Sequence, residues 1–295
     1  MQERHRNRLQ YFNEQSKSTR RYVLPYILAG GTTQTPTNKR RVLEIGCGEG
    51  GNLLPFLERG YECWGIELTA ESYNNALAFY SESPLKENLH LLNKNIYEVT
   101  PSELNGTFDI VFLRDVIEHI PHQERFMQHL KSFVAPQGVV FFAFPPWRMP
   151  FGGHQQISRS KWVSRFPYIH LVPKPILKCF GVSKNDIDSL ENLSETGISI
   201  RRFEKILKAE NYKLLQKTHW LINPNYEIKF GLKPRKLWKI LQIPFLKDFY
   251  TTAMYYLVTK GDITQWEKDF IDERLNIAQC HPEHLHAIEN LPETP

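Results

Sequence analysis

The sequence has no long hydrophobic run and little cysteine. Its strongest uninterrupted apolar stretch, Val139–Phe144, is far shorter than the ~20 residues that a membrane-spanning helix needs. The first ten residues are too polar for a secretory signal peptide. The cysteines, Cys47, Cys63, Cys179 and Cys280, do not have the spacing of a disulfide framework. We therefore expect a cytoplasmic protein with reduced thiols.

The sequence also lacks the features of nucleic-acid-binding and metal-binding proteins. Its net charge is only +5, and because it has no dense Lys/Arg stripe and no known nucleic-acid module, we expect no nucleic-acid partner. Basic residues are concentrated in residues 1–41 and acidic residues in 262–295. The segment Cys280–His286 contains metal-ligand residue types without a second pair of ligands at a known spacing. We therefore expect no metal site and interpret this end of the chain as a solvated acidic tail.

What the sequence does contain is a cluster of glycines between two apolar segments. The run Val42–Ile45 is typical of a buried parallel strand. Gly46, Gly48 and Gly50 follow it, and Asn52–Leu57 has the apolar residues of a helix. Glycines permit positive φ and a close approach of the backbone to a ligand, while the first N–H groups of the helix face the loop. The pattern predicts a strand–loop–helix unit that binds a nucleotide-sized ligand.

Two classes of cofactor fit this unit. The glycine spacing satisfies the dinucleotide pattern Gly-x-Gly-x-x-Gly, so NAD is one candidate. Glu44, two residues before the first glycine, instead favours a ligand with an ammonium group, such as the methionine end of S-adenosylmethionine. The next predicted strand, residues 62–66, ends at Glu67, a carboxylate that suits ribose hydroxyls in both classes. Cys47 is either a nucleophile or a small residue that fills the turn, and we favour the second interpretation.

Strands and helices alternate along the following hundred residues. The periodicity predicts strands at 89–92, 108–113 and 139–144, with helices at 70–80 and 122–133. This alternation indicates a parallel sheet with right-handed crossovers. Because ligands bind beyond the carboxyl ends of such strands, Asn95 falls where an adenine edge would be bound.

Five segments, taken in order, resemble the motifs of class I S-adenosylmethionine-dependent methyltransferases, nearest the small-molecule branch that includes quinone-biosynthesis enzymes. They are VLEIGCGEG, GIEL, NKNIYEV, FDIVFLRDVIEHIP and PQGVVFFAFPP, all between residues 38 and 146. The resemblance implies S-adenosyl-L-methionine as cofactor. It assigns cofactor binding to Glu44, Gly46, Cys47, Gly48, Gly50, Glu67, Leu68, Asn95, Ile96, Arg114, Asp115 and His119. Asn95 departs from the family, which commonly has Asp there.

The resemblance also implies the fold. We expect an α/β fold with a Rossmann-like seven-stranded methyltransferase sheet, mostly parallel with the last strand antiparallel, flanked by helices and carrying a substrate-cap insertion. Residues 200–211 fit a helix, 212–221 a strand and 254–258 the last strand. The expected organisation is an N-terminal helical lid and linker at 1–37, the methyltransferase domain at 38–262 and the acidic tail at 263–295.

The cap insertion, residues 145–199, leaves the fifth strand beside the cofactor site. Connections of this length usually carry function. We expect substrate contacts from Trp147, Phe151, His154 and Gln155. The candidate catalytic residues are His154 and His119, with His170 as a rival. The alternative is that the aromatic residues, with Trp162, Phe166 and Tyr168, form the core of a small cap.

The N-terminal segment and a later basic segment each allow two interpretations. Apolar residues at helical intervals predict a helix from Arg8 to Leu28, which Pro25 ends or kinks. It is either a lid that brings Tyr11, Arg20, Arg21 and Tyr22 to the site, or a helix packed on the sheet. Residues 230–250 interleave Lys and Arg with apolar residues, as a membrane-surface helix does, but Pro234 and Pro244 interrupt them. We favour an ordinary connection whose lysines face water over peripheral membrane contact.

The function that this sequence predicts is methyl transfer by direct in-line displacement to a small-molecule acceptor. Alignment of the two reacting centres is the main requirement, and a general base is needed only if the acceptor must lose a proton. The atom methylated, O, N or C, stays open, as does a macromolecular acceptor and the oligomeric state. The alternatives are an NAD-dependent oxidoreductase, which Glu44 disfavours, and a non-catalytic methyltransferase-like binding protein, which the intact glycine loop disfavours.

Overall fold

The computed structural model of the 295-residue chain describes residues 7–30, 40–153, 155, 161–179 and 182–260. The structural statements below concern these residues. The predicted linker, His154 and the acidic tail with Cys280 lie outside them.

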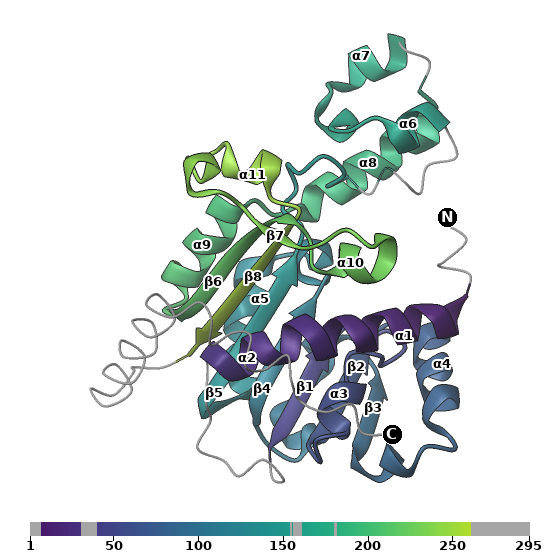
Figure 1. Cartoon of the computed structure of the whole chain (residues 1–295), viewed down its shortest axis with the longest axis vertical. Helices are drawn as coiled ribbons and strands as arrows, with labels where there is room; N and C mark the ends of the chain where they lie inside the picture. Colours follow the sequence, from purple (N-terminus) through teal and green to yellow (C-terminus); the bar gives the residue numbers. More distant parts are fainter. Residues whose placement is uncertain (1–6, 31–39, 154, 156–160, 180–181, 261–295) are drawn as a thin grey trace. The chain divides into compact units, whose positions relative to one another are not determined.

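A single mixed sheet forms the centre of the fold (Figure 1). Its strand order is β3-β2-β1-β4-β5-β8-β6-β7, in which β1 to β5 are parallel and β8 is antiparallel to both of its neighbours. The predicted Rossmann-like sheet with an antiparallel last strand is therefore confirmed. An eighth strand of two residues, β7, adds to the expected seven at one edge. The strands are β1 (Arg41–Ile45), β2 (Glu62–Glu67), β3 (Leu89–Asn93), β4 (Phe108–Arg114), β5 (Val134–Phe144), β6 (Lys213–Ile222), β7 (Arg235–Lys236) and β8 (Ala253–Thr259).

Helices cover both faces of the sheet. Successive residues of a strand point to opposite faces, and β5 shows the consequence. Phe141 packs against Tyr26 on one face, with ring centroids 5.7 Å apart, whereas Phe142 packs against Phe203 on the other at 5.0 Å. No helix in the described part of the chain is long and apolar enough to cross a membrane. The helices are α1 (Arg8–Ser18), α2 (Leu24–Gly30), α3 (Leu54–Leu57), α4 (Ala70–Tyr80), α5 (Gln123–Leu130), α6 (Lys161–Arg165), α7 (Lys174–Cys179), α8 (Lys184–Thr196), α9 (Ile200–Ala209), α10 (Asn225–Phe230) and α11 (Lys247–Tyr250).

Pro25 does not end the N-terminal helix, contrary to one expectation. A π-helical turn, Thr19–Val23, joins α1 to α2, and the N–H of Leu24 donates to the carbonyl of Thr19, five residues earlier. The pyrrolidine ring crowds the carbonyl four residues before it. A wider turn at this point relieves that crowding, so the chain stays helical as far as Gly30.

Two other boundaries differ from the prediction. The fifth strand begins at Val134, not Val139, because Pro136–Gly138 forms a bulge inside the strand instead of a turn before it. A Cβ at Gly138 would lie 2.7 Å from the carbonyl oxygen of Phe108, so the bulge needs glycine. Of the helix expected at 52–57, only Leu54–Leu57 is helical, because the glycine loop extends into turns through Leu53.

The insertion after β5 carries the short helices α6 and α7 and the longer helix α8. Leu177, Ile187 and Leu190 form a small buried cluster of their own, separate from the main core. The insertion therefore has a minor aliphatic core, whereas Phe166, one of the aromatic residues that the alternative interpretation places in such a core, is 57% exposed.

A buried histidine makes stability depend on pH. His219 of β6 lies with its Nε2 2.9 Å from the Tyr256 hydroxyl, and burial, assisted by nearby Lys247, lowers its pKa from 6.5 to about 4. Because the unfolded chain binds this proton more tightly, stability is full above the unfolded pKa and falls as pH drops below it. Between pH 7.5 and pH 5, we expect this group to cost about 2 kcal/mol of the free energy of unfolding.

Urea unfolding of the parent chain and a His219→Gln variant at both pH values measures this contribution. Carboxylates titrate in both proteins. The contribution of His219 is therefore the loss in the free energy of unfolding between the two pH values in the parent, minus the same loss in the variant. An equal loss in both would contradict the assignment.

Candidate active site

The glycine loop between β1 and α3 has the backbone that the sequence predicts. Gly46, Gly48 and Gly50 all have positive φ, of 71°, 55° and 78°. A Cβ at Gly46 would also lie 2.5 Å from the Val116 side chain, so this position tolerates no larger residue. The loop therefore lies at the carboxyl end of β1, where parallel sheets of this class bind ligands.

Glu67, at the end of β2, closes one side of this loop. Its carboxylate accepts hydrogen bonds from the backbone N–H of Gly48 at 2.8 Å and of Thr69 at 2.7 Å. The next residue, Leu68, is 69% exposed, while the Asn93 amide donates to the carbonyl oxygens of both residues. The fixed carboxylate of Glu67 thus lies next to the exposed side chain of Leu68, which could pack against a flat ring of a ligand.

The predicted adenine motif follows β3. The Asn95 side-chain oxygen accepts from the N–H of Tyr97 at 3.1 Å and so caps the short turn that begins at Ile96. The Ile96 side chain is buried in the main core, so any ligand contact would come from its backbone. Contact of Asn95 with an adenine amino group stays a prediction, with one of its oxygen lone pairs already engaged.

A buried polar chain joins Glu44 to Arg114. Asn52 donates to the Glu44 carboxylate at 2.7 Å, and its own oxygen accepts from Arg114 at 2.9 Å. Burial raises the pKa of Glu44, against the lowering effects of Asn52 and Arg114. Its second oxygen, Oε2, is buried and accepts no hydrogen bond from the described residues. A cationic ligand would supply the charge that this carboxylate lacks.

The same arginine fastens the N-terminal helix to the site. Arg114 donates to the hydroxyls of Ser18 at 2.7 Å and Thr19 at 3.2 Å. Near the other end of α1, Arg8 forms an ion pair with Glu49 in the glycine loop. The helix therefore contacts the loop, whereas Tyr26 of α2 packs on Phe141 of the sheet, and the role of α1 as a lid stays a prediction. Arg20 and Arg21 instead form ion pairs with Glu58 and Glu227.

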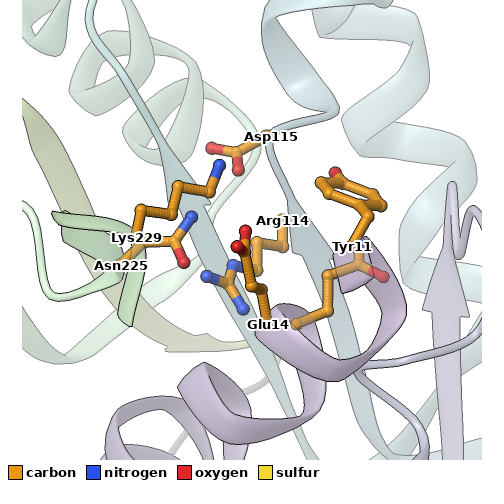
Figure 2. A pocket seen from close by; sticks show the side chains of 7 residues that line it. Tyr11, Glu14, Arg114, Asp115, Asn225 and Lys229 are labelled. Atoms are coloured by element: carbon orange, nitrogen blue, oxygen red, sulfur yellow. The ribbon is translucent and has the colours of Figure 1, made fainter. Parts of the chain in front are cut away.

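A small pocket lies where α1, the end of β4 and α10 meet (Figure 2). Figure 2 shows the Asp115 carboxylate and the Lys229 ammonium pointing toward one another across it. Asp115 has an unfavourable φ of 56° for a residue with a side chain. Burial raises the pKa of Tyr11 from 10 to about 12. The lining residues are Tyr11, Glu14, Gln15, Arg114, Asp115, Asn225 and Lys229.

The cap residues expected to bind substrate make structural contacts. Trp147 packs edge-on against His170 with ring centroids 4.8 Å apart, and its carbonyl lies 2.7 Å from His170 Nε2. The buried Gln155 amide donates to the Pro150 carbonyl at 2.8 Å, whereas Phe151 is partly exposed. These contacts suit the small-cap interpretation, and acceptor binding by Trp147, Phe151 and Gln155 stays a prediction.

His119 and its neighbour Glu118 have contrasting environments. The His119 side chain is exposed, with its Nε2 4.0 Å from the Glu118 carboxylate. Burial, and the charge of Asp115, raise the pKa of Glu118. An exposed imidazole is accessible to a ligand, but a catalytic or cofactor-binding role for His119 stays a prediction.

Comparison with known proteins identifies the family. A family model described as "Methyltransferase domain" matches residues 7–174, more than half of the chain. The chain belongs to this methyltransferase family.

Individual relatives of the methyltransferase are distant. The chain is 24% identical over 208 residues to a ubiquinone biosynthesis O-methyltransferase of Rickettsia canadensis, covering 70% of this chain and 81% of the relative. It is 22% identical over 190 residues to (S)-tetrahydroprotoberberine N-methyltransferase of Eschscholzia californica, covering 62% of this chain and only about half, 52%, of that relative. Geranyl diphosphate C-methyltransferase from Streptomyces coelicolor has a solved structure with a TM-score of 0.51 at 11% identity, covering 83% of this chain and 80% of that one. This last likeness shows the fold alone.

The carboxylates and the apolar side chain around the glycine loop of the methyltransferase fit S-adenosylmethionine, the cofactor of the family. The unsatisfied Glu44 oxygen suits the cofactor ammonium, and Glu67 suits the ribose hydroxyls. The exposed Leu68 side chain offers an apolar contact for the adenine. Cys47 is 1% exposed, and burial raises the pKa of its thiol. It also fills space, because a Cβ at Gly65 would lie 2.7 Å from its sulfur, so the packing interpretation is favoured over a nucleophile.

Sequence reasoning missed Asn52 and the two residues from α10. Asn52 had one available signal, a single amide at the start of the apolar run NLLPF. Asn225 and Lys229 are more than one hundred residues from Asp115 in the sequence, and no motif marks them.

The contact between α1 and the glycine loop can be tested at Gly51. A Cβ added there would lie 2.4 Å from the backbone oxygen of Phe12, so Gly51→Ala must displace α1. We expect a loss of about 1–3 kcal/mol in the free energy of unfolding, as for overpacked cores, and faster hydrogen exchange of the α1 amides.

Gly231→Ala is the matched control. Gly231 has φ of 69° and nothing within 4 Å of the added Cβ, so the variant bears only the backbone cost of roughly 1–2 kcal/mol. Its α1 amides should exchange as in the parent. Unchanged exchange of α1 in Gly51→Ala would show that the helix does not rest on the loop.

Proposed function

We propose that this methyltransferase is a cytoplasmic enzyme that methylates a small-molecule acceptor bound in the pocket between α1, the end of β4 and α10. The observation that supports this proposal is the pocket that Tyr11 and Lys229 form with Asp115, just beyond the carboxyl end of β4. A pocket of this size suits a compact acceptor better than a nucleic-acid base or the side chain of a protein substrate. Family membership also decides against the alternative of an NAD-dependent oxidoreductase.

S-adenosylmethionine supplies an activated methyl group together with its own leaving group. The residues of the chain bind the cofactor and the acceptor and align the two reacting atoms. Glu44, held by Asn52, would bind the ammonium of the cofactor, and Glu67, held by Gly48, would bind its ribose hydroxyls. The helix α1 excludes water from the loop through its Gly51 and Glu49 contacts. Direct in-line displacement then depends on the alignment of donor and acceptor.

The pocket offers three groups that orient an acceptor. Tyr11 offers a neutral phenol as a hydrogen-bond donor, and burial raises its pKa further above the physiological range. Asp115 and Lys229 provide a carboxylate and an ammonium that point toward one another. If the acceptor must lose a proton during attack, we propose His154 or His119 as the base, and Trp147, Phe151 and Gln155 as further acceptor contacts.

The relatives do not select the atom that is methylated. Their names include an O-methyltransferase of ubiquinone biosynthesis, an N-methyltransferase and a C-methyltransferase. They support a small-molecule acceptor for this chain without choosing among oxygen, nitrogen and carbon.

Ligand-dependent stability tests the cofactor. We expect S-adenosylmethionine or S-adenosylhomocysteine, at about 100 times its Kd, to stabilise the fold by about 2.7 kcal/mol, or roughly 5–10 °C in Tm. NAD at the same concentration should leave Tm unchanged. Differential scanning fluorimetry measures both, and stabilisation by NAD alone would overturn the proposal.

Calorimetry tests the ribose carboxylate. Glu67→Ala removes a charged acceptor, and we expect a roughly 10–100-fold weaker affinity for S-adenosylhomocysteine. His154→Ala should change this affinity far less, because we place His154 on the acceptor side. The reverse order would move the cofactor site elsewhere.

A further inference from the structure

The connection between β6 and β8 exposes an unusual number of large apolar side chains. Six of them, all between Leu232 and Leu246, are 47–76% exposed, with Ile240 the most exposed. Single exposed apolar residues are ordinary, but a cluster of this density marks an interaction surface. The six are Leu232, Trp238, Ile240, Ile243, Phe245 and Leu246. We call this stretch the 232–246 segment.

Positive charge is interleaved with these apolar residues. Lys233, Arg235, Lys236 and Lys239 are all exposed. No Asp or Glu occurs anywhere from residue 228 to residue 247. None of the ion pairs between described residues engages these four cations. The segment therefore presents charge of a single sign.

The segment is nevertheless anchored to the sheet. Its β7 residues pair with β6, and the buried Leu237 donates its N–H to the carbonyl of His219 at 2.8 Å. At its far end, Asp248 is buried. The apolar side chains are thus held in solvent by a fixed backbone.

This composition favours a lipid surface over a protein partner. Lys is depleted at protein–protein interfaces, and charged residues on an edge strand such as β7 oppose pairing with another sheet. Lys and Arg beside Trp, Phe and Leu are instead typical of segments that lie in the membrane interface, where anionic headgroups attract the cations. We propose that the 232–246 segment binds the surface of an anionic phospholipid membrane.

The position of the segment gives this binding a consequence for the enzyme. Because β8 is antiparallel to both β5 and β6, β6 is parallel to β5 and ends at the same edge of the sheet as the glycine loop. The same β6–β8 connection contains α10, which supplies Asn225 and Lys229 to the pocket. Membrane binding would hold this side of the enzyme toward the bilayer, where apolar acceptors dissolve.

Vesicle co-sedimentation of the full chain tests the proposal. We expect binding to vesicles of phosphatidylcholine with phosphatidylglycerol, weakening with salt, and much weaker binding to pure phosphatidylcholine. Each basic group near an anionic surface is worth about fivefold in affinity, so Lys233→Gln/Lys236→Gln/Lys239→Gln should weaken binding on the order of a hundredfold. Trp238→Ser/Ile240→Ser should also reduce binding, with the residual affinity resting on the cations and on the four apolar side chains that remain.

Leu77→Ser/Leu214→Ser is the matched control, because these apolar side chains are 46% and 45% exposed but lie on α4 and β6. It should bind vesicles like the parent. Failure of the parent to sediment with anionic vesicles would overturn the proposal, as would equal loss in the control. Self-association that Trp238→Ser/Ile240→Ser abolishes, without vesicle binding, would instead assign the segment to a protein interface. The Tm shift with S-adenosylhomocysteine should persist in every variant, which separates this test from that of the proposed function.

Discussion

The site depends on a buried carboxylate, Glu44, that the protein only half satisfies. A buried charge needs a partner, and removal of one partner is costly. Asn52 donates a hydrogen bond to one oxygen of Glu44 and accepts one from Arg114. The other Glu44 oxygen, Oε2, accepts no hydrogen bond from the described residues. In the proposed complex a cationic group of the cofactor completes the arrangement. Stability and cofactor affinity would then be coupled at this one residue.

Arg114 extends this constraint to the N-terminal helix. Its guanidinium bonds to Asn52, Thr19 and Ser18, so the end of β4, the glycine loop and the junction of α1 with the π-helical turn share one buried network. The π-helical turn both accommodates Pro25 and begins at Thr19. The N-terminal helix is thus positioned by the same buried network that contains Glu44, the residue proposed to bind the cofactor ammonium.

The parts that sequence reasoning predicted are those that local patterns encode. The glycines with positive φ, the carboxylates ending β1 and β2 and the antiparallel β8 follow from period, turn chemistry or a family motif. The eighth strand, the bulge before Val139 and the α10 side of the pocket depend on contacts between distant segments. Such contacts leave no periodic trace in a single sequence. Asn52 lies between these two cases, because the sequence shows an amide at the start of the predicted helix but not its hydrogen-bond partners, Glu44 and Arg114.

The membrane binding proposed for the 232–246 segment does not require an amphipathic helix. The sequence argument required an amphipathic helix, and Pro234 and Pro244 exclude one. The structure has only short turns and β7 there, yet the apolar side chains are exposed. An irregular backbone is costly in the hydrocarbon core, where N–H and C=O groups find no water, but this cost vanishes at the hydrated headgroup level. An anchored loop therefore suffices for interfacial binding, and the prolines, by fixing φ, lower the entropy lost when it docks.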